Sequence, residues 1–128
     1  MNLMHKQKIL ILGILAFLIG LNLLLAPYLN KREATKIVRT VLQLWEKGDI
    51  PGAFNYWENQ ERTPPVYDLI SSKVQKKIFT QNGKDWQARI FVTLEFPEGN
   101  VLPSGREWVF ELKPTEFGWK ITDFRLAE

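Results

Sequence analysis

Asp123 is the residue of this chain whose type and position best suit acid–base chemistry. It lies between Thr122 and Phe124 in a carboxy-terminal stretch that is predicted to form a strand. A carboxylate held there away from water would serve as a general base. The competing interpretation is that Asp123 is a bulge or edge residue that faces water. We favour this second interpretation, because a single Asp without a placed partner makes no catalytic site.

Glu107 and Glu111 share one face of a predicted strand, which is an arrangement that paired catalytic acids would need. Their neighbours Trp108 and Phe110 take the opposite face, so a solvated strand face explains the two glutamates more simply.

Lys73, Lys76 and Lys77 form the densest positive patch downstream of residue 30. Such a patch suits anionic lipid headgroups or an acidic partner. Glu61 and Asp68 lie near it in the sequence, and an ordinary solvated patch is the interpretation that we favour.

Tyr56 and Trp57 are candidate ligand or partner residues, together with Asp123. The other four tryptophans occupy inward positions of periodic elements and are predicted to fill a core: Trp45, Trp86, Trp108 and Trp119. Trp57 follows a short predicted helix, and we expect it at a cavity mouth or an interface because indole suits a half-wet site.

The chain lacks the residues that several reaction classes require. It has no cysteine, which excludes disulfides, thiolate metal sites and cysteine nucleophiles. Its one histidine, His5, lies in a basic flank and is expected to be solvated. No glycine-rich phosphate loop, metal-ligand cluster or nucleophile with a matching base is present. The sequence therefore predicts no catalytic residue, no metal and no cofactor.

The charge balance argues against a nucleic-acid partner. The chain of 128 residues carries 17 Lys and Arg against 14 Asp and Glu. Lys6 and Lys8 stand beside the apolar amino-terminal segment, so the part from Lys31 onward is at only +1. That part is long enough for one modest core, with 45% hydrophobic residues in the chain as a whole.

The apolar run Ile9–Ala26 predicts an uncleaved transmembrane signal anchor. It contains no charge, and 18 helical residues would span about 27 Å, close to the hydrocarbon thickness of a bilayer. Residues 1–8 are then a cytoplasmic basic stub. This places the chain in the cytoplasmic membrane as a single-pass protein, with its domain on the periplasmic or extracellular side.

Small residues recur on one face of this predicted anchor, at Gly13, Ala16 and Gly20. Small side chains let a second helix approach closely, so this face is a candidate for packing against another subunit. The alternative is the ordinary abundance of Gly and Ala in membrane helices.

Helical signals follow the anchor. Residues 27–32 are predicted to be a linker, with Pro27 ending one helix and the capping-box pair Asn30 and Glu33 starting the next. The domain 33–128 then opens with an amphipathic helix whose apolar residues recur at three- and four-residue steps: Ala34, Ile37, Val38, Val41, Leu42 and Trp45.

A second, short helix is predicted directly after the amphipathic one. Gly48 ends the first, and Asp49 caps the second with Pro51 in its first turn. The apolar residues expected to be buried there are Ile50, Ala53, Phe54 and Trp57. The proline-rich loop Glu61–Pro65 follows, and then one further helical turn at Val66–Ile70.

Four later stretches are predicted to form a curved antiparallel sheet: Val74–Gln81, Trp86–Phe96, Arg106–Lys113 and Trp119–Leu126. Asn82-Gly83 suits the hairpin turn between the first two. The second stretch alternates apolar and polar residues, so one face is buried. The last stretch changes parity between Ile121 and Phe124, which predicts a bulge near Thr122–Asp123.

Two short motifs resemble the nuclear transport factor two-like superfamily. They are Gly-Asp-Ile-Pro-Gly-Ala at 48–53 and Trp-Lys-Ile-Thr-Asp-Phe at 119–124, and the resemblance spans residues 33–126. It implies an α+β cone, in which a curved antiparallel sheet wraps around the long amphipathic helix and a cavity opens at the wide end. Enzymes of the superfamily carry an Asp or His base in that cavity, and residues 33–128 contain no histidine.

Two functions are consistent with these features. The first is a membrane-anchored, non-enzymatic interaction module, as an accessory or assembly subunit of a bacterial membrane complex, with the bilayer and other membrane-protein subunits as partners. The alternative is a small-molecule-binding or isomerase-like domain with a hydrophobic cavity and Asp123 as its polar anchor.

Overall fold

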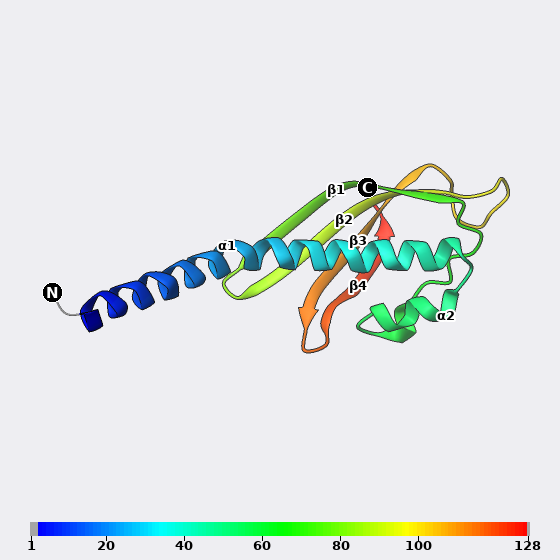
Figure 1. The fold of residues 1–128 in the computed structure, drawn as a ribbon. Coiled ribbons are helices and arrows are strands. Elements are labelled where there is room, and N and C mark those ends of the chain that lie inside the picture. The colour runs from blue at the N-terminus through cyan, green and yellow to red at the C-terminus, as the bar shows by residue number, and fades with distance from the viewer. Residues whose placement is uncertain (1–2, 128) are drawn as a thin grey trace. The chain divides into compact units, whose positions relative to one another are not determined.

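The computed structural model describes the backbone of residues 3–127, and the side chains of 3–5 and 22–28 lie outside that description. The described residues form two α-helices, two 3-10 helices and four strands (Figure 1). Their bounds are α1 Leu3–Glu46, α2 Ile50–Ala53, η1 Phe54–Tyr56, η2 Gln60–Arg62, β1 Ser71–Asn82, β2 Asp85–Glu95, β3 Arg106–Thr115 and β4 Gly118–Leu126. Residues 1–32 and 33–128 form two compact units.

In the part of the chain that the structure describes, no helix is both long enough and apolar enough to span a membrane. The predicted anchor Ile9–Ala26 runs into positions 22–28, whose side chains lie outside the described residues. The described apolar run, Ile9–Leu21, would extend about 20 Å against the roughly 30 Å of a bilayer core. The predictions of a transmembrane helix and of a single-pass membrane location are therefore corrected.

The predicted helix break at residues 27–32 is also wrong. The backbone is helical through Pro27 and Asn30 and onward to Glu46. Inside a helix the backbone N–H groups already bond to carbonyls four residues back, so Asn30 has no helix end to cap. A local capping signal was overridden by the continuation of the helix on both sides.

Residues 33–128 are an α+β unit with a four-stranded antiparallel sheet in the order β1-β2-β3-β4. The register places the apolar residues of three strands opposite one another, with Ile90 paired to Phe110 and Phe110 to Phe124. The last part of α1 lies across this inner face (Figure 1) and buries Ala34, Val38, Val41, Leu42 and Trp45 against it. The alternation in β2 and the periodicity of the helix therefore produce one shared core.

The predicted bulge in the last strand is confirmed. Glu111 pairs with Asp123 and its neighbour Leu112 pairs with Ile121, which leaves Thr122 as the extra residue. The Thr122 hydroxyl donates a hydrogen bond of 3.2 Å to the Glu111 carbonyl. The extra residue lets Ile121 and Phe124 both face the core although their spacing is odd.

A second bulge, at Gln75 in β1, was not predicted. Val74 pairs with Val92 and Lys76 pairs with Phe91, so Gln75 has no opposite residue. The flanking sequence is mostly polar and exposed, and its alternation carries too little signal to reveal a change of parity.

The predicted cap of the short helix α2 is confirmed. The Gly52 amide donates a hydrogen bond of 3.1 Å to Asp49 Oδ1. A Cβ at residue 52 would lie 2.5 Å from Asp49 Oδ2, so glycine leaves room for the capping carboxylate. Ala53 is buried as expected, but Phe54 is 37% exposed because the chain turns there into η1.

The predicted helical turn at Val66–Ile70 is wrong. These residues have no regular secondary structure, although Val66 and Leu69 are buried in the core. Asp68 has φ of 61°, which a right-handed helix cannot contain and which Asp tolerates better than most residues.

Aromatic rings fill the centre of the inner face. The Trp45 ring centroid lies 5.7 Å from that of Trp57, 5.8 Å from that of Phe110 and 5.3 Å from that of Phe124. Trp108 stacks on Phe124 at 4.7 Å. The three rings that Trp45 meets come from the segment after η1, from β3 and from β4, so Trp45 joins the helix to the sheet and to the chain after η1.

We expect Trp45→Ala to lower the free energy of unfolding by about 3–5 kcal/mol, because it leaves a cavity where four aromatic rings meet. Chemical denaturation followed by circular dichroism measures this. Val101→Ala is the control: Val101 is 96% exposed, and its truncation should change stability by less than about 0.5 kcal/mol. Equal effects of the two substitutions would show that Trp45 is not central to the core.

Candidate functional site

Asp123 lies on the outer face of the sheet, away from the aromatic core. Its Oδ2 accepts a hydrogen bond of 2.6 Å from Arg125 Nη1, and its side chain is 47% exposed. The next residue, Phe124, packs into the core against Trp108 and Phe110. This position agrees with the favoured interpretation, a residue beside a bulge that faces water. The alternative, a polar anchor in an interior cavity, would need the carboxylate on the opposite side of the strand.

Tyr56 and Trp57 lie beside the core and apart from Asp123. Trp57 is 3% exposed, and it forms a parallel bridge with Ile121 of β4. Tyr56 is half-buried against the same core. Trp57 is therefore a core residue, as its place beside the short helix predicted, and it does not lie at a cavity mouth, because η1 turns it inward onto Trp45.

Gly13, Ala16 and Gly20 lie in the first unit, on a helix whose surroundings are open. A Cβ added at Gly13 or Gly20 would meet no described atom within 4 Å. The large apolar side chains around them are all exposed, from 40% at Leu21 to 68% at Phe17. This helix surface contacts nothing else among the described residues of its own unit.

An ion-pair network crosses the outer face of three strands. Glu111 Oε1 lies 2.8 Å from Arg125 Nη2 and 3.4 Å from Arg89 Nε. The hydrogen bonds from Arg125 to Glu111 and then to Asp123 raise the pKa of its guanidinium above the ordinary value. Both acids are occupied as ion-pair partners. Glu107 lies four residues from Glu111 along the strand, about 13 Å away, so the two do not form an acid pair.

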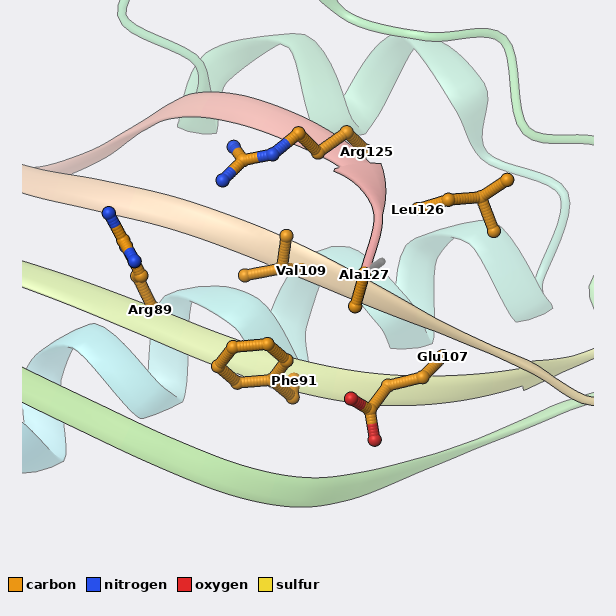
Figure 2. A pocket seen from close by; sticks show the side chains of 7 residues that line it. All are labelled: Arg89, Phe91, Glu107, Val109, Arg125, Leu126 and Ala127. Atoms are coloured by element: carbon orange, nitrogen blue, oxygen red, sulfur yellow. The ribbon is translucent and has the colours of Figure 1, made fainter.

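A groove of about 300 Å³ runs beside this network (Figure 2). Phe91 and Val109 lie in its middle, with the guanidinium groups of Arg89 and Arg125 toward one end and the Glu107 carboxylate toward the other. Lys76 Nζ of β1 lies 4.9 Å from the centre of the Phe91 ring. The groove therefore offers a small apolar surface between charges of both signs.

The sequence did contain a signal for this groove. Phe91 stands at an outward position of the second strand, between Arg89 and Thr93, where a polar residue is expected. Val109 is its cross-strand partner and is only 2% exposed. Two apolar residues at paired outward positions indicate a partly covered outer face, but the pairing is visible only when the strand register is known.

A second groove, of about 380 Å³, lies between α1 and β1 within residues 33–128. Its polar residues come from both elements: Arg39, Gln43 and Glu46 of the helix, and Ser72 and Lys73 of the strand. The Ser72 hydroxyl donates a hydrogen bond of 2.9 Å to Glu46 Oε1 and ties the two walls together. The sequence could not indicate this groove, because its walls are about 30 residues apart.

Among the described residues, no group of three or more His, Cys, Asp or Glu side chains could hold a metal ion. Comparison with family models, with curated proteins and with solved structures found no match to this chain. The resemblance to the nuclear transport factor two-like superfamily accordingly stays a prediction.

We expect the Glu111–Arg125 pair to contribute a coupling free energy of about 0.5 kcal/mol, since both side chains are partly exposed and water screens the pair. A double-mutant cycle with Glu111→Gln and Arg125→Gln, measured by urea denaturation, tests this. The coupling should shrink in about 1 M salt. Glu58 and Lys113 are the control pair: they lie 2.9 Å apart with the Glu side chain more exposed, so their coupling should be smaller. Coupling that is absent, or unchanged by salt, would contradict the expectation.

Proposed function

We propose that this chain is a non-enzymatic interaction module whose apolar helix segment, Ile9–Leu21, docks onto an apolar helical surface of a partner protein. The observation that carries this proposal is the exposure of ten large apolar side chains in 13 residues, between 40% and 68% each. No residue of the segment is charged. A contiguous apolar surface of this size marks an interaction site.

The energetics of the segment support docking. Burying one large apolar side chain contributes about 1.5–3 kcal/mol, so the side chains on the docked face of the segment together offset the entropic cost of association. Gly13 and Gly20 leave space beside the helix that a neighbouring backbone can enter. A helix packed through this segment would gain both hydrophobic burial and close contact.

The ion pairs formed by the acidic residues of the second unit support a non-enzymatic role. Asp123 and Glu111, which the sequence offers as candidate catalytic acids, are held in ion pairs with Arg125 on the outer face. The alternative function required an open apolar interior with Asp123 as a polar anchor. The aromatic rings of Trp45, Trp57 and Phe110 occupy that interior, and no observation on the described residues favours the alternative.

Site-specific photo-crosslinking in living cells tests the proposal. A photoreactive amino acid at Phe17 should give a discrete protein adduct, because this side chain is 68% exposed on the proposed docking segment. The matched control is the same amino acid at Phe117, which is 85% exposed in the turn between β3 and β4. Mass spectrometry of the adducts identifies the partner, and a second copy of the chain would count as one.

Three outcomes would contradict the proposal: the absence of any protein adduct from position 17, adducts that contain lipid alone, and the same set of adducts from positions 17 and 117. The last would report random collision at exposed aromatic positions.

A further inference from the structure

We infer that the groove beside Phe91 and Val109, on the outer face of the sheet, binds a short peptide of two or three residues with both of its ends charged and an apolar side chain between them. This groove belongs to residues 33–128, lies outside the filled interior and is distinct from the apolar helix segment of the proposed function. The inference rests on an apolar floor that faces outward and on opposite charges at the two ends of the groove.

The floor of the groove is apolar although it lies on the outer face. Phe91 and Val109 pair with each other across β2 and β3, with their side chains on the face opposite the aromatic core. Val109 is nearly covered by its neighbours, whereas Phe91, Leu126 and Ala127 are half-buried. These three residues supply the apolar surface that a ligand can reach, and covering it with an apolar side chain favours binding.

The donors of two arginines lie toward one end of the groove (Figure 2). Arg125 donates through Nη1 to Asp123 and through Nη2 to Glu111. Arg89 approaches Glu111 through Nε, at 3.4 Å. A guanidinium carries five N–H donors in a planar fork. The contact with Glu111 therefore does not engage the two Nη groups of Arg89, which can bind a carboxylate through two parallel hydrogen bonds.

The charge balance beside these arginines favours a ligand anion. The two arginines cancel the charges of Glu111 and Asp123, and Lys76 adds a positive charge from β1, with Nζ 4.9 Å from the centre of the Phe91 ring. Lys76 forms no ion pair with any residue that the structure describes. A carboxylate at this end of the groove therefore meets a net positive charge.

The other end of the groove is negative. The Glu107 carboxylate lies there (Figure 2), and it forms no ion pair with another described residue. The Ala127 amide donates a hydrogen bond of 3.0 Å to the Glu107 carbonyl, which fixes the backbone of this wall and leaves the carboxylate exposed. An ammonium group of the ligand would supply the partner that this carboxylate lacks.

The separation of the charged ends sets the length of the ligand. Arg89 pairs with Glu111 across the sheet, and Glu107 lies four residues further along β3, about 13 Å away. Extended dipeptides and tripeptides span about 7 and 10 Å, and a contact of about 3 Å at each charged end lets both lengths reach. A single amino acid carries its two charges side by side and cannot. The groove volume of about 300 Å³ is also at the lower end for small-ligand sites.

The test titrates the tripeptide Ala-Leu-Ala into the full chain labelled with ¹⁵N, with the backbone amide signals followed by NMR. We expect saturable shifts at Phe91 and Val109, with a Kd in the millimolar range. Acetylation of the peptide's amino end, or amidation of its carboxyl end, should each weaken binding at least ~3-fold, because each cap removes one exposed ion pair. Free leucine should also bind at least ~3-fold more weakly, because it cannot span both ends.

Two variants of the chain assign the two ends. Glu107→Gln should weaken the binding of Ala-Leu-Ala at least ~3-fold and leave the binding of the acetylated peptide unchanged, because acetylation removes the same ion pair. Arg89→Gln should behave in the same way toward the amidated peptide. Glu98→Gln and Arg62→Gln are the matched controls: both residues are exposed and outside the groove, so neither change should alter the affinity. Tryptophan fluorescence checks that every variant keeps the aromatic core.

Four results would overturn the inference: no shift at Phe91 or Val109 with ~20 mM peptide, a cap at either end that leaves the affinity unchanged, free leucine that binds as tightly as the tripeptide, or equal loss of the free and the acetylated peptide in Glu107→Gln. A cap without effect would assign the groove to one chain end of a larger partner. Each of these results is independent of crosslinking at Phe17, so the two proposals fail separately.

Discussion

The packing of Trp45 against three other aromatic rings is the contact on which the second unit depends. The indole is 1% exposed and meets Trp57, Phe110 and Phe124. These residues belong to the segment after η1, to β3 and to β4. A four-stranded sheet is stable only when one of its faces is packed against other apolar groups. Trp45 of α1 packs against the middle of that face. With the inner face filled in this way, the accessible side chains of the described residues lie on the outer face, at the sheet edges and on the amino-terminal helix.

The filled inner face also decides what the charged residues can do. Asp123 and Glu111 occupy outer positions of adjacent strands, where Arg89 and Arg125 lie close enough to form ion pairs with them. The bulge at Thr122 sets this arrangement, because it returns Phe124 to the core and leaves Asp123 outside. One extra residue therefore places the Asp123 carboxylate on the surface and the Phe124 ring in the core.

The sequence predicted those features of the second unit that follow from periodicity, and missed those that depend on distant parts of the chain. The alternation in β2, the three- and four-residue steps between Ala34 and Trp45 and the parity change before Phe124 each report a buried face directly. Trp57 was predicted both to be buried beside the short helix and to lie at a cavity mouth, and only its packing against Trp45 and Phe110 decides for burial. The irregular segment around Asp68 was predicted to be helical because residue types are a weak guide to a positive φ at a residue other than glycine. The same limit applies to both grooves, whose walls meet only through tertiary packing.

Predictions for the amino-terminal region failed for a different reason. Pro27 and the pair Asn30 and Glu33 are genuine local signals, yet α1 runs through all three. A capping signal has energetic meaning only where helix ends leave N–H groups unpaired. The apolar composition of Ile9–Leu21 likewise identifies a contiguous apolar surface and does not by itself say whether lipid or protein would cover it.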